Sequence, residues 1–254
     1  MTAVVTGASA GFGREICRRL AADGHKIVAV ARRLDRLMEL QEEIGQAKVH
    51  GVALDVRDRG AVDRAFRELP SDFKDIDVLV NNAGLALGLD PPHKADPAHL
   101  ETMVDTNIKG VLHVTQAVLP GMVERNRGII IMMGSVAANW PYPGGGVYGG
   151  TKAFLKQFSL GLRADLHSTN IRVSVVEPGL VGGTEFSQVR FSGDMERVER
   201  IYDNTTPLNE RDVAEAVGWI CSLPPHVNIN TIEMMPVAQG FGPLPVARRS
   251  AHEK

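Results

Sequence analysis

Short apolar stretches recur along the chain and alternate with longer segments of mixed polarity. Several of these stretches, such as "GIIIMMG" at 128–134, lack the polar alternation that a strand with one face in water would show. Strands that are apolar on both faces are typical of a parallel sheet covered by helices on both sides. The pattern predicts strands at residues 3–6, 26–31, 48–54, 78–81, 128–134, 172–177 and 229–235.

The segments between the strands have the length of helices and carry helix-ending residues. Asp58 and Asn209 lie where a side chain caps a helix N-terminus, and Gly24 and Gly45 lie where glycine ends a helix. The pattern predicts helices at residues 13–23, 34–44, 58–68, 98–126, 148–167 and 210–222. Because strands and helices alternate, we expect right-handed βαβ units that build an α/β fold, a doubly wound parallel seven-stranded sheet of the Rossmann type.

The alternation stops after residue 177. No segment rich in Pro, Gly or Ser divides the chain, so residues 1–254 are predicted to form a single domain. Residues 178–208 show no clear strand and one short charged helical pattern. Long connections in compact domains are often lids or binding loops, so we expect a substrate loop over about 180–208. The apolar, Pro-rich tail, about 237–254, is expected either to be disordered or to pack on something, such as a neighbouring subunit.

Composition narrows the class of protein. The net charge is −2, and the 44% hydrophobic and 23% charged residues are ordinary for a soluble globular protein. A basic excess, a long apolar run and a signal peptide are all missing, so we expect a cytoplasmic protein without nucleic-acid or membrane partners. Cys17 and Cys221 are too few for a disulfide framework and are expected to be reduced, buried thiols. The eight histidines lack ligand-like spacing, so no metal site is predicted.

A glycine-rich turn joins the first strand to the first helix. It reads "TGASAGFG" and contains Gly7, Gly11 and Gly13. Glycine lets backbone N–H groups approach a pyrophosphate, and the helix N-terminus stabilises its negative charge. A plain glycine-rich turn is the alternative, but the place at the start of a βαβ unit favours a dinucleotide-binding loop.

The end of the second strand indicates which dinucleotide binds. An acidic residue at this place usually binds the free ribose 2′-hydroxyl of NAD(H). Here the sequence "VAVARRLDRL" has Arg32 and Arg33 instead, and Asp35 comes later, inside the next helix. Guanidinium groups suit a 2′-phosphate because they form bidentate charged hydrogen bonds. We therefore expect NADP(H), the alternative being that both arginines are ordinary surface charges.

One tyrosine has an unusual setting. Tyr148 lies between glycines in "PGGGVYGGTKAF", at the start of a predicted helix, and Lys152 follows four residues later. Residues with this spacing share a helix face. An ammonium near a phenol favours the phenolate and lowers the phenol pKa, so Tyr148 is a candidate acid and base. The spacing alone is a weak signal, because short motifs also arise by chance.

Other polar residues strengthen this candidate. Ser135 follows a predicted central strand, and parallel sheets bind ligands at the carboxyl ends of their strands. Asn107 lies inside a long helical stretch, where asparagine is unfavourable and therefore needs a reason. The sequence "NNAG" at 81–84 ends a further strand.

Together these motifs resemble the short-chain dehydrogenase/reductase family over residues 2 to about 236. The resemblance implies that Tyr148 is the general acid/base, that Ser135 polarises the substrate carbonyl, and that Lys152 lowers the tyrosine pKa and holds the ribose. Asn107 would anchor a proton-relay water. The cofactor residues that it implies, in addition to Tyr148 and Lys152, are Gly7, Ser9, Gly11, Phe12, Gly13, Arg32, Arg33, Asp55, Val56, Asn82, Gly84, Pro178, Gly179, Val181 and Thr184.

Longer sequence segments narrow the resemblance to one group within this family. "NNAGLALG", "VLPGMVERNRG" and "EPGLVGGTEFSQVRF" are similar to bacterial NADP-dependent 3-hydroxy acid dehydrogenases, also described as serine 3-dehydrogenases, and to the neighbouring sulfoacetaldehyde reductases. This implies the reversible reduction, with NADPH, of a short aldehyde bearing an acidic group one carbon from the carbonyl. That group is a carboxylate, as in malonic semialdehyde, or a sulfonate, as in sulfoacetaldehyde. Family resemblance and the apolar tail also suggest a homotetramer, with "FGPLPV" near a neighbouring subunit.

An anionic substrate needs a partner in the site, because burying an unpaired charge is costly. In the substrate loop Arg190 lies between Val189 and Phe191, and a guanidinium among apolar residues is a candidate anion clamp that would bind substrate with Ser135 and Tyr148. The alternative is that Arg190 pairs with a surface carboxylate, Glu185 or Asp194. For the whole chain, the alternative to an enzyme is a catalytically silent NADP(H)-binding sensor or scaffold, against which the complete tetrad argues.

Overall fold

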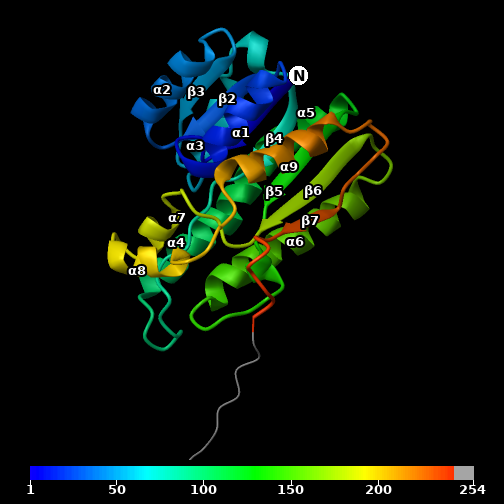
Figure 1. Ribbon diagram of the computed structural model, residues 1–254. Coiled ribbons are helices and arrows are strands. Elements are labelled where there is room, and N and C mark those ends of the chain that lie inside the picture. Colours follow the sequence, from blue (N-terminus) through cyan, green and yellow to red (C-terminus); the bar gives the residue numbers. More distant parts are fainter. Residues whose placement is uncertain (243–254) are drawn as a thin grey trace, which may run out of the picture.

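A seven-stranded parallel sheet forms the centre of the structure, a computed structural model that describes residues 1–242 (Figure 1). The strands lie in the order β3-β2-β1-β4-β5-β6-β7. Their bounds are β1 Thr2–Thr6, β2 Lys26–Ala31, β3 Val49–Ala53, β4 Ile76–Asn81, β5 Gly128–Met133, β6 Ile171–Pro178 and β7 Thr231–Met234. All seven predicted strands are present, so the predicted fold class is confirmed.

The strand order places a crevice near the middle of the sheet. β1 lies between β2 and β4, with Val5 opposite both Ala29 and Val80. After β3 the chain returns to the centre of the sheet and continues outward in the other direction. The connections therefore diverge at the carboxyl ends of β1 and β4, which is where doubly wound sheets bind their ligands.

Helices cover both faces of the sheet, so the molecule has three layers (Figure 1). One apolar cluster joins the sheet to α1, α2 and α9, and a second joins its other face to α3, α5 and α6. The helix bounds are α1 Gly11–Ala22, α2 Leu34–Ile44, α3 Arg59–Arg67, α4 Pro97–Val104, α5 Gly110–Glu124, α6 Gly146–Asp165, α7 Phe186–Arg190, α8 Met195–Tyr202 and α9 Glu210–Ser222.

β1 illustrates why the strands are apolar on both faces. Val5 belongs to the cluster that contains Leu20 of α1, whereas Val4 belongs to the cluster that contains Val114 of α5. All four side chains are fully buried. Burial of such a side chain contributes about 1.5–3 kcal/mol, so polar alternation would be costly in this strand.

The predicted helix ends are confirmed where a side chain or a glycine marks them. The Asp58 side chain accepts a hydrogen bond from the Ala61 N–H, and Asn209 forms a capping box with Asp212. Gly24 and Gly45 have φ values of 87° and 114°, which few other residues adopt at a helix end. Cys17 and Cys221 are free and buried, as predicted.

The long helix predicted at 98–126 is interrupted. α4 ends at Val104, residues 105–109 form one π-helical segment, and α5 begins at Gly110. A π-helical segment adds a residue to the turn and often marks a functional site. Here it contains Asn107, so the helix-unfavourable residue lies where the helical pattern changes.

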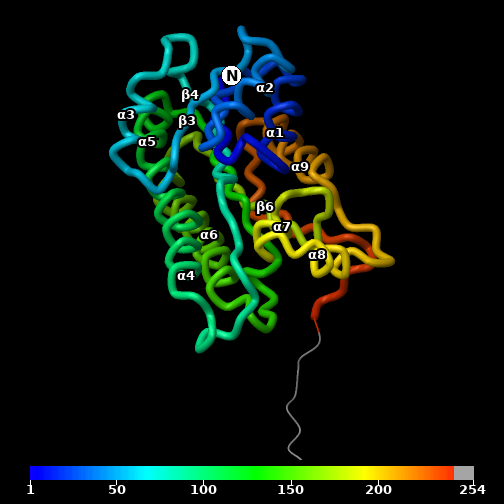
Figure 2. The backbone as a smooth tube through the Cα atoms, turned by 90° about the vertical axis from the view of Figure 1, so that its left-hand side faces the viewer, coloured from blue at the N-terminus to red at the C-terminus, as the bar shows by residue number. Residues whose placement is uncertain are grey.

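The chain between β6 and α9 contains two short helices instead of one. α7 and α8 lie near the carboxyl ends of the strands, at the same end of the molecule as α4 (Figures 1 and 2). In the described part of the C-terminal tail, Phe241 packs on Trp140, at 4.5 Å between ring centroids. The rest of the tail, including most of "FGPLPV", lies outside the described residues. Within residues 1–242, no helix combines the length and the apolar composition that crossing a membrane requires.

Candidate active site

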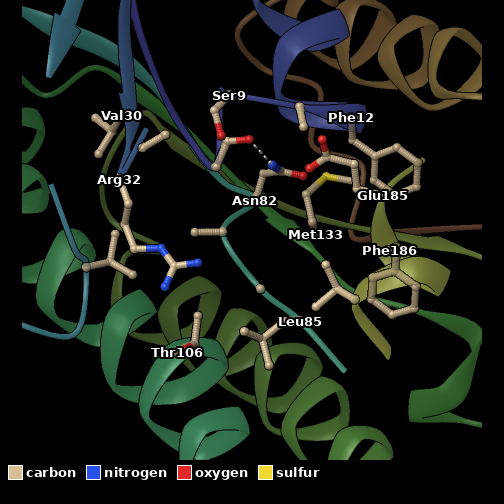
Figure 3. A pocket seen from close by; sticks show the side chains of 18 of the residues that line it. Ser9, Phe12, Val30, Arg32, Asn82, Leu85, Thr106, Met133, Glu185 and Phe186 are labelled. Atoms are coloured by element: carbon tan, nitrogen blue, oxygen red, sulfur yellow. Dashed lines mark hydrogen bonds between the residues drawn. The ribbon is translucent and has the colours of Figure 1, made fainter. Parts of the chain in front are cut away.

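A cavity of about 370 Å³ opens at the carboxyl ends of β1, β2 and β4 (Figure 3). The glycine loop forms one wall. Gly7 has a φ of 70°, and a side chain there would meet the Asn82 amide at 2.8 Å. A side chain on Gly13 would lie 2.2 Å from the Gly7 carbonyl oxygen, so only glycine lets the loop fold this tightly.

The start of α1 is chemically suited to a phosphate group. Its N-cap residue, Ala10, offers no side-chain hydrogen bond, and the first turn contains no acidic residue. Backbone N–H groups at a helix N-terminus need partners, and the helix dipole favours an anion there. The cavity is lined by Ser9, Ala10 and Gly11 at this point. A dinucleotide therefore fits both the shape and the donors of this wall.

The far end of the cavity contains the two arginines that the sequence predicts to bind the 2′-phosphate. Arg32 and Arg33 both line it, with Asp55 and Val56 on the neighbouring wall. Asp55 pairs with Arg57 at 2.6 Å, and this guanidinium lowers the pKa of the carboxyl. Cationic groups at this end suit a 2′-phosphate.

A second cavity, of about 630 Å³, adjoins the first. Tyr148 lines both, because its ring stands on α6 where the two cavities meet. Ser135 and Arg190 line the second cavity, and Lys152 lines the first. The structure thus brings together the sequence-predicted catalytic side chains from two segments, Ser135 from the chain after β5 and both Tyr148 and Lys152 from α6.

The sequence predicts that Lys152 lowers the pKa of Tyr148, and the structure corrects this prediction. Burial raises the pKa of Tyr148 to about 12, and neither the Ser135 hydroxyl nor the Arg190 charge offsets this rise. Burial also lowers the pKa of Lys152 to about 8, because a desolvated ammonium is disfavoured. Lys152 Nζ donates to the Met133 carbonyl oxygen at 2.7 Å and lies 5.7 Å from the Tyr148 ring centroid.

Asn107 holds the backbone beside the site. Its Oδ1 accepts from the Leu85 N–H at 2.9 Å, and its Nδ2 donates to the Leu85 carbonyl oxygen at 2.9 Å. Nδ2 also donates to Thr151 Oγ1 at 3.0 Å, and Thr151 in turn donates to the Tyr148 carbonyl oxygen. The amide therefore ties the chain after β4 to the first turns of α6. The predicted water-anchoring role of Asn107 stays a prediction.

Ser135 lies at the start of a 3-10 turn, η3 (Val136–Ala138). Its Oγ accepts from the Ala137 N–H at 3.2 Å. The next residue after η3, Asn139, donates to the buried Glu177 at 2.9 Å and to Glu233 at 2.7 Å. The segment that carries Ser135 is thus fixed to β6 and β7.

Arg190 points into the second cavity and not toward the surface carboxylates. Its Nη2 donates to Tyr142 Oη at 2.6 Å, and its guanidinium carbon lies 5.7 Å from the Tyr148 ring centroid. Within residues 1–242 it forms no ion pair with Glu185 or Asp194, so the alternative pairing is not found. The position fits the predicted anion clamp beside the Tyr148 ring.

The remaining predicted cofactor residues divide between the two cavities. Pro178, Gly179 and Val181 line the second cavity. Gly13 shapes the loop from behind, as described above. The others line the first cavity, namely Gly7, Ser9, Gly11, Phe12, Arg32, Arg33, Asp55, Val56, Asn82, Gly84, Tyr148, Lys152 and Thr184.

Sequence reasoning missed several aromatic and loop residues that shape the site. Phe186 lines both cavities and packs against Tyr148, at 5.7 Å between ring centroids. Tyr142 holds Arg190, and Trp140 lines the second cavity with Phe241. Tyr142 and Trp140 stand in the same "WPYPGGGVY" segment as Tyr148, which was the available signal.

Comparison with known proteins agrees with this arrangement. The profile of the family described as short chain dehydrogenase matches residues 1–194. NADP-dependent 3-hydroxy acid dehydrogenase YdfG of Salmonella typhi is 59% identical over 98% of this chain and 100% of that protein. Serine 3-dehydrogenase of Agrobacterium fabrum is 47% identical over 98% of this chain and 99% of that protein.

A solved structure of a serine dehydrogenase, in its closed form and complexed with NADP⁺, is 57% identical to this chain. It covers 98% of this chain and 100% of its own, with a TM-score of 0.96. The glycine loop, the Ser135–Tyr148–Lys152 grouping and these relatives lead to one conclusion, that the chain belongs to the short chain dehydrogenase family.

Proposed function

We propose that the protein is an NADP(H)-dependent oxidoreductase that interconverts a short hydroxy acid, of the 3-hydroxy acid or serine type, and the corresponding carbonyl compound. The observation that carries the proposal is the place of Tyr148, between a cleft suited to a dinucleotide and a cavity that contains Arg190. The names of the relatives support the same cofactor and substrate class.

The cofactor would be held by the glycine loop at its pyrophosphate and by the arginines after β2 at its 2′-phosphate. When bound, its nicotinamide ring supplies or accepts the hydride of the reaction. Lys152 lies on the cleft side of Tyr148, where a ribose hydroxyl could accept from its amine. Hydrogen bonds from the ribose and the substrate would offset the burial of both side chains.

Residues of the chain itself would transfer the proton and bind the substrate. Ser135 Oγ would donate to the substrate oxygen, and the Tyr148 hydroxyl would give it a proton during reduction and take one back during oxidation. Arg190 would bind the acidic group of the substrate. Aromatic residues of the second cavity, Phe186 among them, would exclude water from the reacting atoms.

The acidic group is a carboxylate or a sulfonate, so malonic semialdehyde and sulfoacetaldehyde are both candidate substrates for reduction. A panel of assays distinguishes the candidate substrates. It tests these two aldehydes and propanal with NADPH, and serine and 3-hydroxypropionate with NADP⁺. We expect the anionic aldehydes to be reduced far faster than propanal. Tight NADPH binding without turnover of any compound would favour the alternative of a silent NADP(H)-binding protein.

The cofactor preference has its own test. We expect a strong preference for NADPH over NADH, because two guanidinium groups stand where an acid would bind the free hydroxyl. Changing both Arg32 and Arg33 to alanine should raise the KM for NADPH far more than the KM for NADH. Equal use of the two cofactors by the unaltered protein would overturn this part of the proposal.

A further inference from the structure

A cluster of charged side chains lies beside the turn that carries Ser135. Glu177 of β6 is fully buried, and Glu233 is its neighbour on β7, because the two residues are partners in the parallel register. Like charges this close repel each other. Lys156 of α6 offsets the repulsion, with its Nζ 3.2 Å from Glu177 Oε2. The cluster therefore combines two carboxylates and one ammonium where β6 and β7 end.

The Asn139 amide joins all three charged groups. Its Nδ2 donates to Glu177 Oε2 at 2.9 Å and to Glu233 Oε2 at 2.7 Å. Its Oδ1 accepts from Lys156 Nζ at 2.8 Å. The reversed amide would turn its N–H groups toward the ammonium, which has no acceptor, so these partners fix the orientation of the side chain. Asn139 is thus bound to α6, β6 and β7 at once.

Both ends of the Ser135 turn contact this cluster. Asn139 directly follows the turn, which is closed by the Ala138 N–H donating to the Ser135 carbonyl oxygen at 2.9 Å. At the other end, a side chain on Gly134 would lie 2.9 Å from Glu177 Cγ, so Glu177 packs closely against the residue before Ser135. A shift of Asn139 or Glu177 would therefore be passed to the backbone of Ser135.

The cluster itself stands outside the site. Ser135 and Trp140 line the second cavity, and the Trp140 indole Nε1 donates to Glu233 Oε2 at 3.2 Å. Among the described residues that line either cavity, none belongs to the cluster of Asn139, Lys156, Glu177 and Glu233. The cluster can therefore act on a bound substrate only through the residues that it holds in place.

We propose that Asn139, held by the three charged side chains, is a positioning residue that keeps the Ser135 hydroxyl directed at the substrate oxygen. The inference rests on the proposed function, since it assumes that Ser135 acts in carbonyl reduction. A buried carboxylate is costly unless it is fully paired, and within residues 1–242 the Oε1 of Glu177 has no hydrogen-bond partner. A role in fixing a reacting group explains this cost, because a displacement of about 1 Å can lower a rate by about 10²-fold.

Asn139→Ala removes all three side-chain bonds and tests the role. With the best substrate of the panel its kcat should fall by about tenfold or more, while the Kd for NADPH stays unchanged. In Ser135→Ala, which lacks the hydroxyl to be positioned, the same change should lower the remaining kcat by less than about twofold. Losses of equal size in both proteins, or no loss in either, would overturn the assignment.

Lys156 provides a second variant that should fold, since 32% of its side chain is accessible. Lys156→Met leaves Glu177 and Glu233 without their ammonium, so kcat should again fall while NADPH binding is retained. Lys156→Arg keeps the charge and should retain most of the activity. An unaltered kcat in Lys156→Met would show that the charged cluster does not position Ser135.

Asn228→Ala serves as the matched control. The Asn228 amide also forms three hydrogen bonds, to the N–H and carbonyl groups of Val173 and to Asn230, but it lies near the opposite end of β6. Its loss should lower the midpoint of urea denaturation, as that of Asn139 does, and should leave kcat unchanged. An equal fall of kcat in Asn228→Ala would assign the effect to general weakening of β6 and would overturn the positioning role.

Hydrogen exchange tests the anchoring in the protein alone, without cofactor or substrate. Asn139→Ala should raise deuterium uptake in peptides that cover residues 134–141, and Asn228→Ala should not. Unchanged uptake in Asn139→Ala would overturn the anchoring whichever reaction the protein catalyses. Raised uptake, together with no turnover of any panel compound by the unaltered protein, would instead overturn the proposed function and leave the anchoring in place.

Discussion

At the scale of single residues, the properties of Tyr148 depend on what surrounds it. Its ring is buried, and burial raises the pKa of its hydroxyl to about 12. A neutral, protonated phenol at the junction of the two cavities is suited to donate a proton in the reductive direction. The opposite direction requires a group that stabilises the phenolate, and Lys152 is the nearby amine on the cofactor side.

Removing the hydroxyl of Tyr148 tests this role. Tyr148→Phe keeps the ring and its packing against Phe186, so the variant should fold and bind NADPH normally. Its kcat should fall by at least about 10²–10⁴-fold, the usual contribution of general acid/base catalysis. Steady-state kinetics with the best substrate of the panel, together with NADPH titration by fluorescence, measure both effects. A variant with nearly unaltered kcat would show that another group supplies the proton.

Arg190 gives a second prediction at this scale. Arg190→Leu should lower kcat/KM for an anionic aldehyde by tenfold or more, about 1.4 kcal/mol or above, and should hardly affect propanal. Tyr142→Phe is the matched control, because it removes the hydroxyl that Arg190 contacts and keeps the charge. Equal losses on charged and uncharged substrates in Arg190→Leu would mean that Arg190 only supports the loop, through Tyr142 and the Gly88 carbonyl oxygen.

The sequence predicted which residues meet at the site better than it predicted their properties. The four-residue spacing of Tyr148 and Lys152 follows from helix geometry and was confirmed by their place on α6. The pKa shifts went the other way because desolvation depends on residues from several distant segments, which spacing does not reveal. The hydrogen-bonded ion pair of Arg33 with Glu185 was missed for the same reason, since Glu185 lies 152 residues away in the sequence.

At the scale of elements, the strands were easiest to predict and the helix around Asn107 was hardest. Apolar runs identify strands buried on both faces, and all seven were found. The π-helical segment at 105–109 was not predicted, because a single extra residue per turn hardly changes the apolar pattern. Its one visible signal was Asn107, a helix-unfavourable residue whose amide bonds to Leu85 and Thr151.

The hydrogen bonds of Asn107 predict its effect on stability. Asn107→Leu would leave the N–H and carbonyl groups of Leu85 without their partners, each at a cost of about 1–3 kcal/mol. We expect the free energy of unfolding to fall by about 2–4 kcal/mol, measured by urea denaturation. Thr151→Val removes only one of the Asn107 bonds, together with the bond that Thr151 donates to the Tyr148 carbonyl oxygen, and should cost less. A loss below about 0.5 kcal/mol in Asn107→Leu would argue against this anchoring role.

At the scale of the whole molecule, one edge of the sheet is a candidate interface. β7 is the outermost strand, and Figure 1 shows it between α6 and α9. Leu160 of α6 is 41% exposed and Trp219 of α9 is 48% exposed, so apolar side chains flank this edge. Unpaired strand edges and exposed apolar groups are often covered by another chain.

We therefore predict that the protein assembles, as the homotetramer suggested by the family resemblance. Sedimentation velocity at micromolar concentration should give a tetramer. Trp219→Glu places a charge beside the β7 edge and should shift the protein to smaller species. Met38→Glu, at an exposed position of α2 near the opposite edge of the sheet, should not. A clean monomer for the unaltered protein would refute the predicted assembly.

The buried amine of Lys152 should make the stability of the whole molecule depend on pH. Its pKa is lowered from 10.5 to about 8 in the folded protein, because burial disfavours the ammonium. Between these two values the unfolded chain binds the proton and the folded chain does not, so the contribution of Lys152 to stability rises with pH. Below pH 8 both states are charged, and the folded protein carries the full cost of the buried ammonium. That cost is on the order of 3 kcal/mol for a shift of this size.

Lys152→Met isolates this contribution, since methionine has a similar shape and no charge. Without cofactor at pH 7, the variant should be more stable than the unaltered protein, and its advantage should shrink as the pH rises from 8 toward 10.5. Tyr148, Cys17 and Cys221 also have raised pKa values, but they are present in both proteins, so their effects cancel in the comparison. Urea denaturation of both proteins at several pH values gives the difference directly. A difference that stayed constant across this range would show that Lys152 does not titrate there, and that its amine is stabilised as an ammonium by its bond to the Met133 carbonyl oxygen.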